Sequence, residues 1–150
     1  MKSKGSESLY IVIVGCGRLG SDLANRTSSA GHSVVVLDRA PEAFGNLSQD
    51  FSGFTVEGDA TELRVLKQAR MGKADVVFAA THDDNVNLMV AQVAGRIFAV
   101  QKVLARVFDP RREQVYGQLG IETICPTSVA VRMFLEKMEQ PATGRKGAAS

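Results

Sequence analysis

The chain has 150 residues, of which 45% are hydrophobic and 23% are charged. These values are typical of one soluble globular domain whose core needs neither a disulfide nor a structural metal. The formal charge of +2 is too small to predict nucleic acid or an anionic membrane as the main partner. The two cysteines, Cys16 and Cys125, have the spacing of neither a zinc site nor a disulfide framework.

The sequence predicts one folded segment between polar ends. Residues 1–8 are polar, and residues 140–150 are rich in Gly, Ala and Ser, so we predict that both ends are disordered. Residues 9–139 then form the domain. No run of 18 apolar residues occurs, which predicts no direct insertion into a membrane. The few cysteines fit a reducing, cytoplasmic location.

Short apolar runs alternate with helical patterns along this domain. The first run, residues 9–14, ends in glycine and predicts a buried strand, and a helix follows over 19–30 with Gly31 as its stop. The later strands are predicted over 33–37, 53–57, 74–80, 102–108 and 121–125. The later helices are predicted over 41–49, 62–71, 84–99, 110–119 and 129–138. The expected helix caps are Thr61, either Asp83 or Asp84, and either Thr127 or Ser128.

This alternation predicts the fold class. Strands that alternate with helices form a parallel sheet covered by helices on both faces. We therefore predict an α/β domain with a Rossmann-type, doubly wound, six-stranded parallel sheet in three layers. Ligands of such folds bind at the carboxyl edge of the sheet.

A glycine-rich loop follows the first strand and opens the first helix. It consists of Gly15, Cys16, Gly17, Arg18, Leu19 and Gly20. The first glycine permits a tight turn, the second lets a pyrophosphate approach the backbone, and the third lets the helix pack closely on the strand. Free N–H groups at the start of the helix then bind phosphates. In this position the pattern favours nucleotide binding over a plain strand–helix turn.

Three charged residues accompany the loop. Asp38 follows the second strand, where a carboxylate accepts hydrogen bonds from the ribose hydroxyls and repels a 2′-phosphate, or else caps the next helix. The first role favours NAD(H) or an adenine mononucleotide over NADP. Arg39 weakens that preference, because a guanidinium pairs with phosphate. Arg18 lies either beside a terminal phosphate, as in bound ATP or ADP, or in solvent.

Further candidates follow the third, fourth and fifth strands. Asp59 would accept a hydrogen bond from the adenine amino group while Ala60 packs on the ring, or Asp59 would only stabilise a turn. His82 follows the fourth strand, where a catalytic role competes with that of a solvated loop residue, which is favoured. Arg106 lies among apolar residues, so its charge needs either a carboxylate or bound phosphates.

Together these residues resemble a known family, the nucleotide-binding lobe of RCK (regulator of K⁺ conductance) domains, also called TrkA-N domains. The resemblance covers about residues 9–138 and is carried by the glycine loop with its arginine, Asp38, Gly58 to Thr61, Ala80 and Thr81 with Asp84 and Asn87, and Ala105 to Pro110. It implies that the nucleotide is lined by Gly15, Gly17, Arg18, Leu19, Gly20, Asp38, Arg39, Asp59, Ala60, Thr81 and Arg106.

The resemblance also implies a function. It implies a cytoplasmic regulatory domain that associates with a membrane potassium channel or transporter subunit. Such domains bind NAD(H), ATP, ADP or AMP, act by conformational change and form homodimers or higher rings. Many relatives carry a second, C-terminal lobe, which these 150 residues do not include. Some relatives hold a cation through a glutamate where this chain has Thr127, which counts against a metal site and against a preference for ATP.

Two questions stay open at the level of sequence. The last predicted helix has an apolar side formed by Val129, Met133, Phe134 and Leu135. This side packs either on its own sheet or across a dimer, and the resemblance favours the dimer. Alternatives to a nucleotide sensor are a small NAD-dependent oxidoreductase and a nucleotide-binding fragment of a larger chain. For the oxidoreductase, the sequence offers no general acid with an orienting partner.

Overall fold

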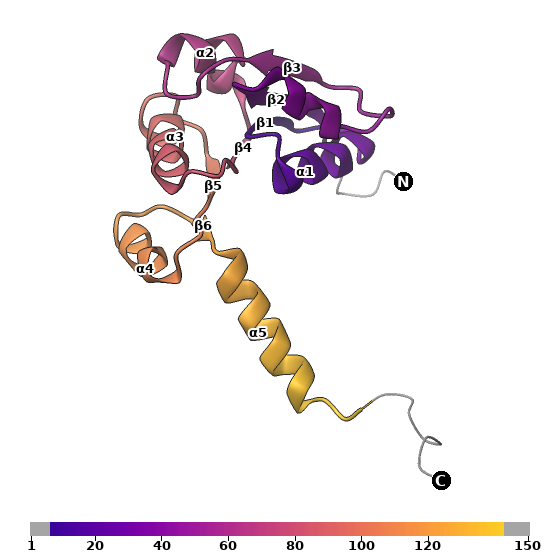
Figure 1. Ribbon diagram of the computed structural model, residues 1–150. Helices are drawn as coiled ribbons and strands as arrows, with labels where there is room; N and C mark the ends of the chain where they lie inside the picture. Colours follow the sequence, from indigo (N-terminus) through magenta and orange to yellow (C-terminus); the bar gives the residue numbers. More distant parts are fainter. Residues whose placement is uncertain (1–6, 143–150) are drawn as a thin grey trace.

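Six strands form one parallel sheet in the order β3-β2-β1-β4-β5-β6 in a computed structural model that describes residues 7–142 (Figure 1). The strands are β1 (Tyr10–Val14), β2 (Ser33–Asp38), β3 (Phe54–Glu57), β4 (Val76–Ala79), β5 (Lys102–Arg106) and β6 (Thr123–Ile124). This confirms the predicted Rossmann-type sheet. Most of the two ends that were predicted to be disordered, residues 1–6 and 143–150, lie outside the described residues.

The helices follow the predicted alternation, with shifted ends. They are α1 (Arg18–Ser29), α2 (Leu63–Gln68), α3 (Asp84–Arg96), α4 (Pro110–Gln118) and α5 (Pro126–Glu139). Two short 3₁₀ helices, η1 (Pro41–Asn46) and η2 (Met71–Lys73), replace parts of predicted α-helices. The helix predicted over 62–71 ends early because Arg70 adopts a left-handed backbone with φ of 56°, which interrupts the helical path before η2.

Two of the predicted helix caps are wrong. Thr61 does not cap α2, because its hydroxyl donates to the Asp59 carboxylate over 2.7 Å. Thr127 and Ser128 lie inside α5, which begins at Pro126. The proline takes the first helical position, where no backbone N–H donor is needed. The third prediction is resolved in favour of Asp83, whose carboxylate accepts hydrogen bonds from the N–H groups of Asn85 and Val86.

The apolar side chains of β1 supply both faces of the core. Ile13 packs with Ala24 of α1 on one face, whereas Val12 and Val14 pack on the other face with residues of α2 and α3. Alternate residues of a strand point to opposite faces, so a continuous apolar run needs helices on both sides. Each of these fully buried Val and Ile side chains contributes about 1.5–3 kcal/mol to folding. The three-layer arrangement follows from this pattern.

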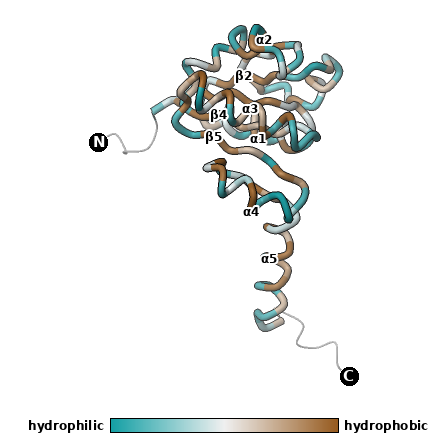
Figure 2. The backbone as a smooth tube through the Cα atoms, turned by 90° about the vertical axis from the view of Figure 1, so that its left-hand side faces the viewer, coloured by the Kyte–Doolittle hydropathy of each residue, from teal (hydrophilic) through white to brown (hydrophobic). Residues whose placement is uncertain are grey.

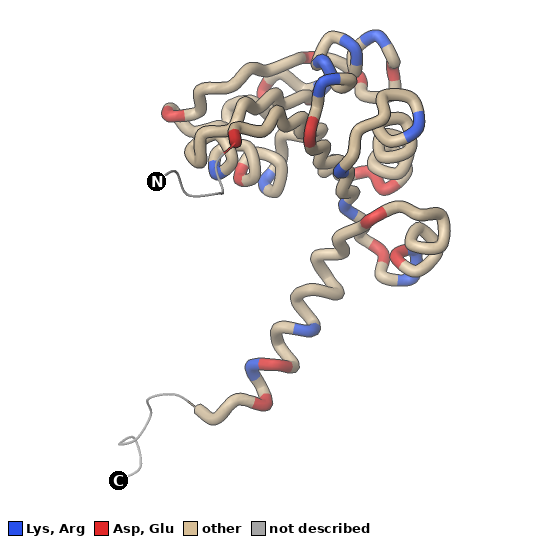
Figure 3. The backbone as a smooth tube through the Cα atoms, turned by 180° about the vertical axis from the view of Figure 1, so that it is seen from behind, with Lys and Arg blue, Asp and Glu red and all other residues tan. Residues whose placement is uncertain are grey.

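Helix α5 departs from the rest of the domain. It extends away from the sheet (Figure 1), and none of its residues is buried. Phe134 is 76% exposed and Met138 is 72% exposed. Figure 2 shows hydrophobic segments along this free helix, and Figure 3 shows its charges gathered in the half nearer the C-terminus. Helix α5 therefore does not pack on its own sheet, which was one of the two sequence-based alternatives.

No helix within residues 7–142 has both the length and the apolarity that crossing a bilayer requires.

Candidate nucleotide-binding site

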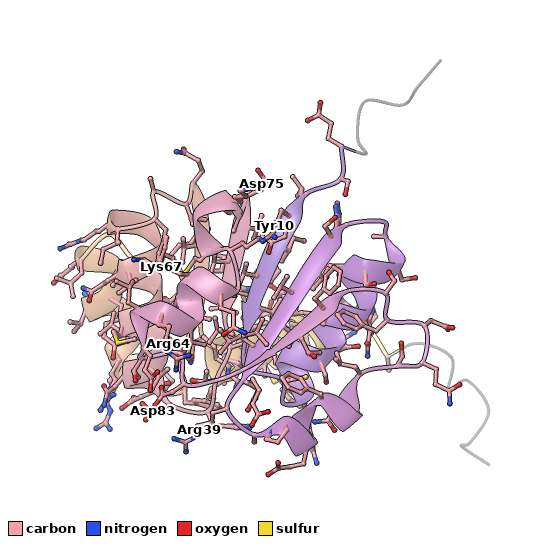
Figure 4. All side chains as sticks on the ribbon, turned by 90° about the horizontal axis from the view of Figure 1, so that it is seen from above. Tyr10, Arg39, Arg64, Lys67, Asp75 and Asp83 are labelled. Atoms are coloured by element: carbon pink, nitrogen blue, oxygen red, sulfur yellow. The ribbon has the colours of Figure 1, made fainter. Side chains whose placement is uncertain are left out.

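A pocket of about 260 Å³ lies at the carboxyl edge of the sheet. The pocket is lined by residues at the ends of β1, β2, β3 and β4 and in the loops that follow them. It therefore includes the point between β1 and β4 where the strand order reverses. Seven of the residues predicted from sequence line this pocket: Gly15, Gly17, Asp38, Arg39, Asp59, Ala60 and Thr81. Figure 4 shows Arg39 and Asp83 at this edge, at the opposite end of the sheet from Tyr10 and Asp75.

The glycine loop has the predicted close approaches. Gly15 has φ of +104°, and a Cβ there would lie 2.8 Å from the backbone carbonyl of Ala80. A Cβ at Gly20 would collide with the carbonyl oxygen of Gly15, so the third glycine lets helix and loop pack. Leu19 lies in the first turn of α1 but does not line the pocket. The first N–H groups of a helix have no acceptor within it, which leaves them available to an anion.

The Asp38 carboxylate connects β2 to the glycine loop. One oxygen accepts a hydrogen bond from the N–H of Cys16 at 2.8 Å, and the other accepts from the N–H of Ala40 at 2.8 Å. The interpretation of Asp38 as a helix cap is wrong, because η1 is capped by Ala40 without a side-chain bond. Each carboxylate oxygen has a second lone pair that can accept from a ribose hydroxyl.

Burial and the nearby charge of Asp38 change the chemistry of Cys16. Burial, and secondarily the negative charge of Asp38, raise the pKa of the Cys16 thiol to about 11. The thiol therefore stays protonated at neutral pH. This makes Cys16 a packing residue of the loop and a poor nucleophile.

The loop after β3 has a turn built on Asp59. One carboxylate oxygen of Asp59 accepts from the N–H and the hydroxyl of Thr61, at 2.8 and 2.7 Å. These bonds, followed by the charge of Arg39, lower the pKa of Asp59. The predicted turn role is therefore present. The predicted contact with adenine stays a prediction, and Ala60 beside it is buried in the pocket wall.

Asn87 of α3 organises the loop after β4. Its side-chain oxygen accepts from the N–H and the hydroxyl of Thr81, at 2.8 and 2.6 Å. Its amide nitrogen donates to the carbonyl oxygens of Thr81 and Arg106, each at 3.0 Å. Asn87 is completely buried, so one side chain joins the pocket wall to β5. Sequence reasoning quoted Asn87 as part of a motif but did not assign it this role.

The partners of Arg106 are backbone carbonyls and an aromatic ring. Its guanidinium donates to the carbonyl oxygens of Ala80 and Thr81, at 2.7 and 2.8 Å, and lies 4.5 Å from the ring centre of Phe108. Two carbonyls and an aromatic face thus take the place of a carboxylate, and the alternative of bound phosphates stays a prediction. Burial lowers the pKa of Arg106, an effect that Asp84 opposes. Arg106 and Arg18 lie outside the pocket wall.

Three polar residues follow β4. Asp83 caps α3, and Asp84 accepts a hydrogen bond from the N–H of Phe108 at 2.9 Å. His82 lines the pocket, with its ring parallel to that of Phe108. Across residues 7–142, no three His, Cys, Asp or Glu side chains are grouped to hold a metal ion.

Comparison with known proteins decides the family. The family model for the TrkA-N domain matches residues 11–126. The chain belongs to the TrkA-N family. This confirms the resemblance read from the sequence, and it places the domain in a family associated with potassium transport.

One relative of this TrkA-N domain is the Trk system potassium uptake protein TrkA of Streptomyces coelicolor. It is 41% identical over 130 residues, which cover 87% of this chain and 56% of the relative. The TrkA homologue of Methanothermobacter thermautotrophicus is 31% identical, and the match covers 60% of that protein. The chain thus spans between half and two thirds of the length of these curated relatives. Both are named as potassium uptake proteins.

Solved structures share the TrkA-N fold. The Kef CTD of Shewanella denitrificans, in its AMP-bound form, is 26% identical with a TM-score of 0.71, and the match covers 86% of this chain and 79% of that one. The GsuK channel bound to NAD is 21% identical with a TM-score of 0.63, covering 84% of this chain and 22% of that one. Structural relatives of the domain therefore include one bound to AMP and one bound to NAD.

Proposed function

We propose that this TrkA-N domain is a cytoplasmic nucleotide sensor that regulates a membrane potassium channel or transporter subunit. NAD(H) is the first candidate ligand, and ATP, ADP and AMP are the others. The observation that carries the proposal is the pocket in which the glycine loop and Asp38 are joined by the hydrogen bond from Cys16. Phosphate-binding amides and a ribose-binding carboxylate are thereby held in one site.

The nucleotide would bind with its parts distributed along the sheet edge. The diphosphate lies on the first turn of α1, where N–H groups and the positive end of the helix dipole favour an anion. The adenosine ribose donates its hydroxyls to Asp38, and adenine lies against Ala60 beside Asp59. A 2′-phosphate would face the Asp38 carboxylate, so NADP is disfavoured. The AMP of the Kef CTD and the NAD of GsuK support this ligand class.

The signal would leave the pocket through the loop after β4. Asn87 and Arg106 tie the backbone of Thr81 to β5 through four hydrogen bonds. A ligand that displaces Thr81 must therefore also displace β5 or break buried hydrogen bonds. Occupancy then shifts the domain between arrangements by as much as the ligand's affinity differs between them. The partner subunit responds to this shift, and no chemical turnover is involved.

Helix α5 would be the contact to a second copy of the chain. A free helix of 14 residues is marginal in water, and α5 receives no support from its own sheet. A second copy of α5 covers the same apolar residues by two-fold symmetry. We therefore propose a homodimer, from which a higher ring can be assembled.

Calorimetric titration tests the proposed ligand class. Titrating the purified chain with NAD⁺, NADH, ATP, ADP, AMP and NADP⁺ should give binding, with NADP⁺ the weakest. Gly17→Val should abolish binding, because its side chain stands where the diphosphate approaches. Gly117→Val is the matched control, since a Cβ at Gly117 meets no atom within 4 Å. If none of the six nucleotides binds, the sensor proposal is wrong.

An oxidoreductase would behave differently. Incubation with NADH and a panel of carbonyl substrates should show no oxidation of NADH above the buffer rate. Sustained turnover that disappears in Gly17→Val would favour the enzyme over the sensor.

A further inference from the structure

Three side chains form a column behind the glycine loop. The guanidinium carbon of Arg106 lies 4.5 Å from the ring centre of Phe108. The ring centres of Phe108 and His82 are 6.3 Å apart, with an interplanar angle of 19°. Phe108 thus contacts both a half-buried arginine and an exposed imidazole at the pocket wall. Offset stacking of this kind restrains the orientation of the imidazole.

The free end of this imidazole lies over the glycine loop. A Cβ built on Gly17 would lie 3.1 Å from Nε2 of His82. Gly17 is the N-cap of α1, the position at which the backbone is expected to meet a diphosphate. A ring nitrogen of His82 is therefore already within hydrogen-bond reach of the place where a phosphate oxygen would lie.

The backbone of Phe108 is held by two contacts. The N–H of Phe108 donates to the Asp84 carboxylate at 2.9 Å, and the carbonyl oxygen of Phe108 faces the buried thiol of Cys125 at 3.8 Å. The column is thus supported by α3 and by the start of α5. His82 itself is exposed, and its ring stacks beside that of Phe108.

We propose that His82 is a phosphate ligand of this pocket and that it binds the diphosphate as an imidazolium. Nucleotide binding is then coupled to the uptake of a proton, so the sensor responds to pH as well as to nucleotide. This inference rests on the proposed nucleotide function. A cation stacked on an aromatic ring and donating to a phosphate forms a charge-assisted hydrogen bond, which is stronger than a neutral one.

The other charges around the imidazole are compatible with this role. Acidic residues of the pocket wall are Asp38, Asp59 and Asp83, and Asp84 binds the Phe108 backbone. The nearby cations are Arg39 in the pocket wall, Arg18 beside Gly17 and Arg106 over the ring of Phe108. A diphosphate adds negative charge directly at Gly17 and therefore favours protonation of the ring upon binding.

The pH dependence of NAD⁺ affinity tests this proposal. NAD⁺ is the chosen probe because its diphosphate carries no group that titrates near neutral pH. Imidazole side chains gain a proton between about pH 5 and pH 8. We expect the intact chain to bind NAD⁺ about tenfold more tightly at about pH 6 than at about pH 8, the value of one charge-assisted hydrogen bond. Adenosine, which lacks phosphate, should show no such dependence.

Two histidine variants separate His82 from general effects of pH. His82→Gln keeps an N–H donor but cannot become a cation, so it should retain the affinity measured at about pH 8 and lose the gain in acid. His32→Gln is the matched control. His32 accepts a hydrogen bond from the N–H of Leu9 outside the pocket, so the pH dependence should remain.

Several outcomes would overturn the inference. Equal affinity at both pH values, or a gain that persists in His82→Gln, would show that His82 does not bind phosphate as a cation. Tighter binding by His82→Ala at both pH values would show that the imidazole obstructs the phosphate position. An absence of NAD⁺ binding at both pH values would overturn this inference, whereas the proposed function fails only if none of the six nucleotides binds.

Discussion

The carboxylate of Asp38 accepts a 2.8 Å hydrogen bond from the backbone N–H of Cys16. This contact joins the end of β2 to the loop that precedes α1, although the two residues are far apart in the sequence. The side chain that would bind the ribose therefore also determines where the phosphate-binding backbone lies. Substitutions at Asp38 should accordingly affect ligand affinity and folding stability together.

Asp38→Ala tests this double role. The variant removes an ionised acceptor from two backbone N–H groups, so the free energy of unfolding should fall by about 1–3 kcal/mol. Affinity for NAD⁺ should fall at least tenfold. Urea denaturation and calorimetry measure the two effects. Asp22→Ala is the control, since Asp22 only pairs with Arg26 on the exposed surface of α1 and should change stability by less than about 0.5 kcal/mol. An unchanged NAD⁺ affinity in Asp38→Ala would contradict the ribose assignment.

Cys16 should be unreactive in the folded chain. Its thiol pKa of about 11 leaves almost no thiolate near pH 8, and the side chain is buried. Alkylation by iodoacetamide, followed by mass spectrometry of the Cys16 peptide, should proceed far more slowly in the folded than in the urea-unfolded protein. Rapid alkylation of Cys16 under native conditions would show that the loop opens readily.

The same pKa predicts the direction of a stability change in base. The folded state holds the Cys16 proton more tightly than the unfolded state, whose thiol has the ordinary pKa of 9.0. The contribution of Cys16 to stability is therefore complete below pH 9 and decreases as the pH rises from 9 toward 11. Burial also raises the pKa of Tyr10, so both proteins should lose stability in base, but denaturation across this range should show a steeper loss in the unmodified chain than in Cys16→Ala.

Asn87→Leu tests the buried amide of α3. The substitution removes the acceptor of the Thr81 N–H and the amide donor to the carbonyls of Thr81 and Arg106, which should cost about 2–4 kcal/mol of unfolding free energy. Denaturation in urea measures the loss. Asn85→Leu is the control, because Asn85 lies exposed on the same helix and should change stability by less than about 0.5 kcal/mol. Equal stabilities of the two variants would show that the network contributes little.

Helix α5 should determine the oligomeric state. Analytical ultracentrifugation should find the intact chain as a dimer or a larger ring, and Phe134→Glu should give monomers because a charge would be buried at the contact. Lys137→Glu, a charge change on the same helix, is the control and should leave the assembly largely intact. A monomeric intact chain, or an assembly unaffected by Phe134→Glu, would contradict the proposed interface.

Sequence patterns predicted the fold well because the signals of the central strands are local. The apolar runs of β1 and β2 are continuous, since both of their faces are buried, and Gly15 and Gly31 take the positive φ angles that the turns require. Helix ends were predicted less well. Arg70 interrupts a helical pattern through its backbone conformation, and nothing in its residue type signals this.

Only part of the candidate pocket could be predicted, because local patterns show strand ends but not contacts between distant segments. Residue types at the ends of strands identified the pocket wall, because parallel strands end at one edge. Contacts between distant segments were not accessible in this way. The bonds from Arg106 to the carbonyls of Ala80 and Thr81 depend on the register of β4 and β5, and the position of His82 over Gly17 depends on the path of the loop.

The most direct test of the central claim is a crystal structure of the chain grown with saturating NAD⁺. The account predicts a diphosphate on the backbone of Gly17 and Arg18, with the adenosine ribose hydroxyls within hydrogen-bond distance of the Asp38 carboxylate. Crystals grown with either NAD⁺ or AMP in which this pocket contains only solvent would contradict it.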